Sequence, residues 1–544
     1  MKKTLLLFFA FTWCFSASSQ VGVTTYDPET EASYTLFSEL FGNNSYLIDN
    51  CGRLINEWNP TGGNGLSSAL LPNGNLVRGV KTSGSTITQP STGGAIEIRN
   101  WDDEPIWFYK ESDTNFIQHH DFIIMPNGNI LFLGWENIWI PEQLALGKDS
   151  SLVTNPALWG EYIKEVKPDG QNGEVVWEWH QKYHFVQDIN ETSDNYGVIS
   201  ESPHKLDINL PLHPLQFSLV DPYHANAIDY NPVRDEIVIN MRSIGELWII
   251  DHSTTTEEAM TDSGGNSGLG GSILYRWGNP EVYQQEESDS DWKLFGSHGT
   301  NFVDEGHPDE GKIIFFNNGV LRPDGSYSTI EIIEPDLDDQ GNYYLNENSQ
   351  FATKEHKVVY GSDKSLSSDF ISNAHQLANG NIFINEGENS RLLEVDQEEN
   401  ILWEYQIPLL NGFPINQSSS NNNFLCFKAF KYPIDYFTNE ELDLSPGDFI
   451  ELNVETNFCD LVSVEEEALS YELKRYQDRI EINLPIQKNK MNLISINGQV
   501  IDFNHSILTN YTTIDLSSLH SGIYILNFED SEGNSSQYKF AVMR

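Results

Sequence analysis

Short runs of alternating apolar and polar residues, separated by turn residues, extend along most of the chain, and helical periodicity is almost absent. In one recurring pattern two strand-like runs flank a turn and end on an aromatic residue, which predicts a β-hairpin. Six stretches follow this pattern: residues 46–58, 95–109, 162–179, 247–277, 329–360 and 392–403. We expect most of their aromatic residues to pack between repeated units.

A second set of hairpins alternates with the first. It comprises residues 66–81, 120–135, 224–242, 298–318 and 372–387, and a degenerate sixth near 423–432. Several of these hairpins contain Asn-Gly, a strong hairpin signal because both turn positions tolerate positive φ. Two hairpins per unit, repeated six times, are typical of a β-propeller, whose four-stranded blades surround a central channel. We therefore predict an all-β chain whose main part is a six-bladed β-propeller.

The two ends of the chain differ from this pattern. Residues 1–20 combine Lys2 and Lys3 with an apolar run and then small residues, which is the layout of a secretory signal peptide. We predict a propeller over 21–445, a linker over 446–465 and a small β-sandwich-like domain over 466–544. No other stretch approaches the length of a membrane span, so we expect no membrane insertion.

The predicted C-terminal domain has short strand-like runs at 480–484, 491–496, 513–516 and 523–528. Its segments 497–500, 516–519, 521–526 and 539–544 closely resemble the C-terminal sorting domain of type IX secretion substrates. This resemblance implies the type IX secretion machinery as a partner. It also implies export through the periplasm to a secreted or cell-surface location.

The balance of charges excludes some classes of partner. Acidic residues outnumber basic ones by 80 to 31, which gives a formal net charge of −49. Such a chain repels nucleic acid and anionic membrane surfaces. A solvated acidic exterior is the preferred interpretation of the excess.

Cysteine use suggests one disulfide in the exported protein. Once Cys14 leaves with the signal peptide, Cys51, Cys426 and Cys459 remain. Oxidising compartments favour pairing, and we expect Cys51 to pair with Cys426 or Cys459. One thiol is left over in either case.

Three hairpins of the second set begin with a histidine at the same register. His120, His224 and His298 each stand seven residues before the turn of their hairpin. Equivalent positions in a ring of repeats converge on one place. His375 is three residues out of step with this register and is expected to be structural.

Pairing across each hairpin predicts the neighbours of these histidines. In residues 224–242 it places Arg242 opposite His224 and aligns Asn226 with Asn240. The same reasoning places Trp135 opposite His120, as a platform for a phenyl ring, and Asn318 opposite His298. We expect Trp135, Asn318, Asn226 and Asn240 to bind substrate.

A lone histidine at a strand end is usually structural, but three in one register favour a site. Three imidazoles could bind zinc or copper. Arg242 argues against a metal, since a cation beside a cation is costly. We expect no metal and no cofactor. The combination instead suits a small tetrahedral oxyanion, and a neutral histidine nitrogen could act as a nucleophile in group transfer.

Residues 224–251 resemble the signature segment of bacterial arylsulfotransferases. Similarity extends to 119–122, 313–319 and 380–405, and so spans roughly 45–435. The resemblance implies a six-bladed propeller that moves a sulfuryl group between small-molecule aryl sulfates and phenols. It also implies a ping-pong reaction through a sulfated histidine, without a nucleotide sulfate donor.

The resemblance also implies roles for individual residues. His298 corresponds to the nucleophile, and His224 and Arg242 correspond to residues that hold the sulfuryl and bridging oxygens. His120 corresponds to a histidine that binds oxyanion or transfers a proton, with His119 as the second choice. The chain departs from the family in a long turn at 303–312, and in Asn317, which replaces the usual acid.

Two other functions are compatible with these patterns. One is a non-catalytic secreted propeller that binds glycans, phenolic compounds or surface proteins. The other is a quinone- or metal-dependent oxidoreductase on a similar scaffold. Residues 336–347 nearly fit a calcium loop, although an acidic hairpin turn is preferred there. Rim loops at 183–222 and 253–271 are expected to select the substrate.

Overall fold

The structure is a computed structural model. It describes residues 20–455, except 41, 171, 212, 213, 217, 285–291, 421 and 440, and the strands between 473 and 542 with a few residues beside them. The predicted signal peptide therefore lies outside the described residues. Among the described residues no helix is long and apolar enough to cross a membrane.

Six antiparallel sheets make up the larger part of the structure, and each begins with the strand nearest the centre. Three of them are β5 (Asn64–Leu70), β6 (Leu76–Lys81), β7 (Gly94–Arg99) and β8 (Pro105–Lys110); β9 (Phe116–Ile124), β10 (Ile130–Trp139), β11 (Ala157–Asp169) and β12 (Asn172–His180); and β15 (Ala225–Asn231), β16 (Glu236–Met241), β17 (Glu246–Asp251) and β18 (Ile273–Trp277).

The other three sheets include the two ends of this part of the chain. They are β19 (His298–Phe302), β20 (Ile313–Asn317), β21 (Thr329–Pro335) and β22 (Thr353–Tyr360); β23 (Asn373–Gln376), β24 (Ile382–Glu386), β25 (Arg391–Val395), β26 (Ile401–Gln406) and β1 (Gly22–Tyr26); and β29 (Ala429–Pro433), β2 (Ser33–Ser38), β3 (Ser45–Asp49) and β4 (Leu54–Trp58).

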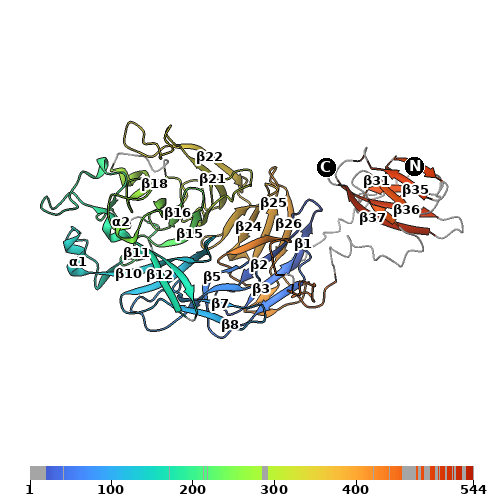
Figure 1. The fold of residues 1–544 in the computed structure, drawn as a ribbon, viewed down its shortest axis with the longest axis horizontal. Coiled ribbons are helices and arrows are strands. Elements are labelled where there is room, and N and C mark those ends of the chain that lie inside the picture. Colours follow the sequence, from blue (N-terminus) through green and yellow to red (C-terminus); the bar gives the residue numbers. More distant parts are fainter. Residues whose placement is uncertain are drawn as a thin grey trace, which may run out of the picture.

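The sheets form a closed ring. β5 contacts β9, β9 contacts β15, β15 contacts β19 and β19 contacts β23, while β24 contacts β29 and β2 contacts β5. In Figure 1 the blue strands β1, β2 and β3 accordingly lie beside the orange strands β24, β25 and β26. This arrangement is a β-propeller, as the alternating hairpins predict.

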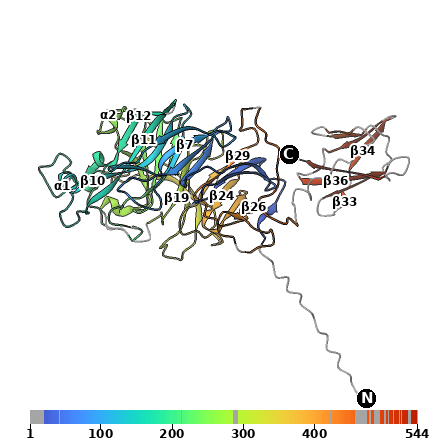
Figure 2. The same ribbon diagram turned by 90° about the horizontal axis from the view of Figure 1, so that it is seen from below.

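The prediction of a sixth inner hairpin near 423–432 is wrong. Ala429–Pro433 forms the single strand β29, which pairs antiparallel with the N-terminal strand β2 instead of folding back on its own neighbours. Figure 2 shows β29 next to a blue strand from the start of the chain. The two ends of the propeller segment thus share one sheet, which closes the ring.

Most of the aromatic residues that end the outer hairpins are buried between structural units, as expected. Trp58, Trp179 and Trp403 are each fully buried. Each indole N–H donates to a backbone carbonyl on a distant segment: Trp58 to Asn100 at 2.9 Å, Trp179 to Gly271 at 2.7 Å and Trp403 to Asn50 at 2.8 Å. The apolar rings supply buried area, and the polar tips are satisfied.

Short elements connect the sheets. Two α-helices occur in the described residues, α1 (Ile140–Ala145) and α2 (Thr256–Ala259). Single 3₁₀ turns form at Gln181–His184, Ile199–Glu201, Pro280–Tyr283 and Gly387–Asn389, and small two-stranded sheets pair β13 (Phe185–Val186) with β14 (Leu206–Asp207) and β27 (Leu409–Leu410) with β28 (Phe413–Pro414).

The C-terminal part contains two four-stranded antiparallel sheets. One contains β30 (Leu473–Arg475), β31 (Arg479–Ile482), β35 (Tyr511–Asp515) and β34 (Asn504–Leu508); the other contains β33 (Val500–Ile501), β32 (Met491–Ser495), β36 (Gly522–Glu529) and β37 (Ser535–Val542). Apolar residues of both sheets, such as Ile480, Ile514, Leu493 and Leu526, share one core. The β-sandwich predicted here is therefore confirmed.

The segment predicted to begin the linker belongs to the propeller. Gly447 N–H donates to Leu54 O at 2.8 Å, and Leu452 N–H donates to Ile415 O at 2.8 Å. Ile450 joins the apolar cluster around Trp403. Residues 447–452 therefore pack on the propeller because their backbone groups and one apolar side chain have partners there.

Two further predictions concern single segments. Cys51 is disulfide-bonded, whereas Cys426 is a buried free thiol, so the pairing of Cys51 with Cys426 is wrong. Cys459 lies outside the described residues, and its pairing stays a prediction. The segment 336–347 forms an acidic turn in which the Asp338 carboxylate accepts from the Asn342 N–H at 2.9 Å, which agrees with the preferred interpretation.

One buried ion pair ties the closing strand to the neighbouring sheet. Lys431 of β29 contacts Glu394 of β25, and both side chains are fully buried. Replacing Lys431 by Met leaves an uncompensated buried carboxylate, so we expect Lys431→Met to lower the free energy of unfolding by about 3–5 kcal/mol. Urea unfolding followed by tryptophan fluorescence measures the free energy of unfolding. The signal reports on the propeller and not on the C-terminal domain, because no tryptophan follows Trp403.

The double variant Lys431→Met/Glu394→Gln is the control. It removes both charges and keeps an acceptor for the Asn381 amide, which donates to Glu394 at 2.7 Å. Most of the lost stability should return, because a neutral pair carries no buried charge. Equal destabilisation of both variants would show that the charge is not the cause.

Candidate active site

A cavity of about 550 Å³ lies where the inner strands of the propeller converge. His120, His224, Arg242 and His298 all line it. These side chains come from three different sheets, since His120 lies on β9, His298 begins β19, and His224 and Arg242 flank the hairpin of β15 and β16. The structure therefore brings together the three histidines and the arginine that the repeat register singles out.

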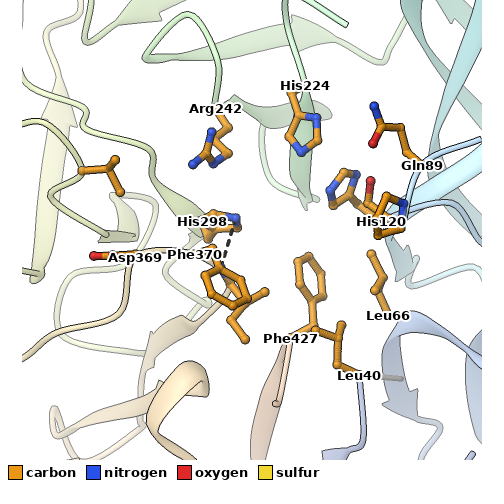
Figure 3. A pocket seen from close by; sticks show the side chains of 14 residues that line it. Leu40, Leu66, Gln89, His120, His224, Arg242, His298, Asp369, Phe370 and Phe427 are labelled. Atoms are coloured by element: carbon orange, nitrogen blue, oxygen red, sulfur yellow. Dashed lines mark hydrogen bonds between the residues drawn. The ribbon is translucent and has the colours of Figure 1, made fainter. Parts of the chain in front are cut away.

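The cavity has a polar side and an apolar side. In Figure 3 Arg242 and His224 lie on one side, Phe427 and Leu40 lie opposite, and His298 and His120 lie between them. Phe370, Leu66 and Ile371 extend the apolar side. Such a cavity offers donors to an oxyanion at one end and a surface for a ring at the other.

Strained backbone near the start of three inner strands accompanies the inward direction of Leu66, His120 and His224. Leu66, His120, His224 and Ser372 all have positive φ, between 46° and 93°, near the start of an inner strand. Irregularities interrupt the pairing of β5, β9 and β15 at the same level. A bulge with left-handed backbone turns a side chain away from the regular alternation, which frees it to face the channel.

His224 and Arg242 are held by the backbone and by one carboxylate. Arg242 N–H donates to His224 O at 3.2 Å, which confirms that they are neighbours across the hairpin. His224 Nδ1 lies 2.5 Å from the buried Asp221 carboxylate. Arg242 donates through Nη1 to Leu215 O at 3.1 Å. Burial lowers the pKa of Arg242 to about 10, so the guanidinium remains charged at neutral pH.

The hydrogen bonds of His298 define its tautomer. Ile371 N–H donates to Nε2 at 3.2 Å, so Nε2 carries the lone pair. Nδ1 therefore bears the hydrogen and donates to Asn318 Oδ1 at 2.8 Å. The Asn318 amide is oriented by its own donation to Ser368 O at 2.7 Å. Burial and the nearby Arg242 charge lower the pKa of His298 to about 3, which keeps the ring neutral.

His120 is backed by a second histidine and a buried carboxylate. Its Nδ1 lies 2.8 Å from His119 Nδ1, and His119 Nε2 lies 3.0 Å from Glu161 Oε2. Glu161 Oε1 accepts from the Trp135 indole at 3.1 Å and from Ala225 N–H at 2.9 Å. Burial lowers the pKa of His120 well below its ordinary value.

Trp135 does not occupy its predicted position. The irregularity in β9 makes Trp135 pair with Ile117, not with His120. The indole stacks on His119, with ring centroids 3.8 Å apart, and is fully buried behind the wall of the cavity. It therefore supports the His119 ring, and Phe427 faces the cavity instead.

The two asparagines of the His224 hairpin also lie behind the wall. The bulge pairs Ala227 with Asn240, so Asn226 is not directly opposite as predicted. Their side chains still meet, because Asn240 Nδ2 donates to Asn226 Oδ1 at 2.7 Å. Both amides donate to Ser297 O, at 2.7 and 2.8 Å. They thus position the residue before His298 and do not line the cavity.

Asn318 is also displaced from its predicted partner in the backbone register. His298 pairs with Phe316. The Asn318 side chain nevertheless reaches the imidazole, as described above.

His375 is separate from this group, because it lines a second cavity of about 380 Å³ with Asp229 and Lys428. No three potential metal ligands come together among the residues that the structure describes.

Several residues of the site escape the repeat pattern. Phe427 lies just before β29, within the segment predicted as a degenerate hairpin, and Asp221 and Glu161 lie in other elements, so only their spatial contacts reveal them. The prediction that the loops 183–222 and 253–271 surround the site is partly wrong. The first loop reaches the site, because Leu215 O accepts a hydrogen bond from Arg242. Gly271 of the second loop instead contacts Trp179 on the outer strand β12. The cavity is lined by residues of other loops, Gln89–Ser91, Val320 and Asp369–Ile371.

The fold and this site define a propeller with a histidine- and arginine-lined channel pocket. The chain belongs to the arylsulfotransferase (ASST) family, whose profile matches residues 42–407. Membership supports aryl sulfotransferase activity in general. Residues 476–543 match the secretion system C-terminal sorting domain, which indicates export to the surface or the medium.

Comparison with other proteins shows only distant similarity. No curated protein matches the chain. A protein of unknown function from Bacteroides caccae is 11% identical with a TM-score of 0.39, over 74% of this chain and 99% of that one. Virginiamycin B lyase from Staphylococcus aureus is 10% identical with a TM-score of 0.32, over 72% and 85%. The Dos1 propeller is 10% identical with a TM-score of 0.30, over 91% and 92%.

Binding of an inert analogue tests the two-sided cavity. Benzenesulfonate carries an aryl ring and a tetrahedral oxyanion joined by a C–S bond. We expect it to bind the wild type in calorimetric titration. Arg242→Ala should weaken binding roughly tenfold to a hundredfold, because a hydrogen bond to a charged group contributes about 1.5–3 kcal/mol.

Arg234→Ala is the matched control for this experiment. Arg234 lies in the turn of the same hairpin and pairs with Glu236 at 2.9 Å, outside the cavity. It should bind benzenesulfonate as the wild type does. Equal weakening in both variants would mean that general charge, and not the Arg242 contact, attracts the ligand.

Proposed function

We propose that the protein transfers a sulfuryl group from an aryl sulfate to a phenol through a sulfated His298. The observation that carries this proposal is the neutral, oriented Nε2 of His298 in a cavity that also presents Arg242, His224 and a phenylalanine. This arrangement places a nucleophile, oxyanion donors and an aryl surface within one site.

The donor ester would bind with its ring against Phe427 and its sulfate toward Arg242 and His224. Arg242 offers a fork of donors to two sulfuryl oxygens. Asp221 holds Nδ1 of His224, so Nε2 can donate to an oxygen. The negative charge that moves onto the bridging oxygen during cleavage would then be stabilised where it develops.

In the first half-reaction His298 Nε2 attacks sulfur. An N–S bond forms, the bond between sulfur and the aryl oxygen breaks, and the electron pair leaves on the phenolate. His120 supplies the proton that makes the phenol. Because Ile371 N–H occupies the Nε2 lone pair at 3.2 Å, that hydrogen bond must open before the attack.

In the second half-reaction a different phenol binds against the same apolar side. Its oxygen attacks sulfur, the N–S bond breaks and Nε2 regains its lone pair, while His120 accepts the phenolic proton. No nucleotide takes part in either step. Each half-reaction uses one aryl ring at a time, which is compatible with a ping-pong order.

Asn318 explains how the sulfated histidine stays reactive. The amide oxygen accepts the Nδ1 hydrogen without removing it, since an amide is a very weak base. Sulfation of Nε2 therefore gives a ring that is cationic and bound to an anionic sulfuryl group. A cationic ring is a better leaving group than a neutral one, so the second transfer is accelerated.

The direct test is covalent labelling. Incubation of the wild type with phenyl sulfate should release phenol and add one sulfuryl mass to the peptide that contains His298. Mass spectrometry of the digested protein locates the label, and His298→Asn should abolish both label and turnover because it removes the nucleophile.

His375→Asn is a matched control, since this half-buried histidine lines the second cavity. It should keep the label on His298. Phenol release without any label on His298 would contradict the covalent mechanism. The absence of both phenol and label with every aryl sulfate would contradict the proposed function and leave ligand binding as the role of the cavity.

The lowered pKa of His298 predicts the pH dependence of labelling. A ring with a pKa of about 3 remains neutral between pH 7.5 and pH 5, so the rate of labelling by 4-nitrophenyl sulfate should stay level over this range. An unshifted histidine would lose about thirtyfold in its neutral form by pH 5. Rapid-quench labelling measures the rate, and a fall centred near pH 6.5 would contradict the assignment.

A further inference from the structure

Behind His120 lies a continuous chain of ionisable groups that the transfer step itself does not contact. Glu161, His119 and His120 are linked by hydrogen bonds of 3.0 and 2.8 Å. Glu161 and His119 are fully buried, and His120 is 4% exposed. Only His120 lines the cavity. This chain of hydrogen-bonded side chains therefore runs from the substrate cavity into the body of one sheet and ends at the Glu161 carboxyl group.

We propose that Glu161 and His119 are positioning residues that store the proton of the acceptor phenol, from the second half-reaction until the next donor ester is cleaved, by setting the protonation of His120. This inference rests on the proposed sulfuryl transfer. It deepens that function, because a stored proton lets the site cleave esters of weakly acidic phenols, whose phenolates need a proton to leave.

The hydrogen bonds allow two states of the chain that differ by one proton. In the first state His119 Nε2–H donates to the Glu161 carboxylate, His120 Nδ1–H donates to His119 Nδ1, and His120 Nε2 carries a lone pair. In the second state the Glu161 carboxylic acid donates to His119 Nε2, His119 Nδ1–H donates to His120 Nδ1, and His120 Nε2 bears a hydrogen. Both imidazoles are neutral in both states.

These two states match the needs of the reaction. When the donor ester is cleaved, His120 Nε2–H gives its proton to the leaving phenolate, and the chain passes from the second state to the first. When the acceptor phenol attacks, His120 Nε2 takes its proton and the chain returns to the second state. One proton leaves and one returns per cycle, so the overall transfer consumes none.

The surroundings favour storage on Glu161 over an imidazolium. Burial raises the pKa of Glu161 well above its ordinary value, and the Asp221 charge adds to this. Burial lowers the pKa of His119 to about 3. Besides burial, the neighbouring His224 and the Arg242 charge on the cavity side further lower the pKa of His120 and so disfavour a cation there.

Packing keeps the chain aligned. Trp135 stacks on His119 with an interplanar angle of 17° and also donates its indole N–H to Glu161 Oε1. Ala225 N–H donates to the same oxygen, so Oε2 is directed at His119. This backbone contact comes from the residue after His224, which couples Glu161 to the oxyanion side of the site.

The test compares two donors in full-length protein. Phenol has a pKa near 10, so phenolate is a strong base and needs a proton to leave. 4-Nitrophenolate is a much weaker base and leaves without one. Glu161→Gln keeps the size and an acceptor oxygen but cannot store the proton. Labelling of His298 by phenyl sulfate should slow roughly a hundredfold, the scale of general acid catalysis, while labelling by 4-nitrophenyl sulfate should change by less than about threefold.

His119→Phe provides a second interruption of the chain. It retains an aromatic ring against Trp135 but removes both nitrogens, and it should show the same selectivity between donors. Glu165→Gln is the matched control, because Glu165 is another buried carboxylate of β11 that pairs with a histidine, His252, at 3.1 Å. It should label with both donors at the wild-type rate. Urea unfolding of each variant reports whether it is folded.

The outcomes separate this inference from the proposed function. If the wild type labels His298 but Glu161→Gln and His119→Phe slow both donors equally, the two residues are only structural and the proton store is wrong. If neither variant slows the labelling of His298 by phenyl sulfate, the proposed storage of the proton is also wrong. If the wild type itself never labels, the proposed function fails first.

Discussion

The pairing of β29 with β2 is the contact on which the rest of the propeller depends. It joins residues almost 400 positions apart and turns an open row of sheets into a ring. Closure sets the distance between the inner strands, and hence whether side chains from three sheets meet in one cavity. The buried contact between Lys431 and Glu394 and the ring of Trp403 reinforce this junction from the neighbouring sheet.

Closure also creates an unusual electrostatic environment in this acidic protein. The chain carries a net charge of −49, yet the cavity presents Arg242 and three histidines. Burial keeps His298 and His120 neutral, whereas Arg242 keeps its charge. A neutral nucleophile beside a permanent cation suits an anionic ester, because the nucleophile stays available and the ester is still attracted.

Much of the fold follows from local patterns. Alternation, Asn-Gly turns and terminal aromatics predict the hairpins because each signal acts within about ten residues. The shared register of His120, His224 and His298 predicts a common site because repeats place equivalent residues alike. The sixth hairpin fails for the same reason, since β29 has no local partner and finds one only at the other end of the chain.

The three histidines and the arginine of the cavity were thus present in the repeat register, but their exact neighbours were not. Bulges at the start of the inner strands shift the pairing by one residue or more, which moves Trp135 behind His119 and Asn226 out of line with Asn240. Phe427, Asp221 and Glu161 join the site from segments that share no pattern with the histidines. Such contacts depend on how three sheets pack around a closed ring, and no periodicity along the chain records that packing.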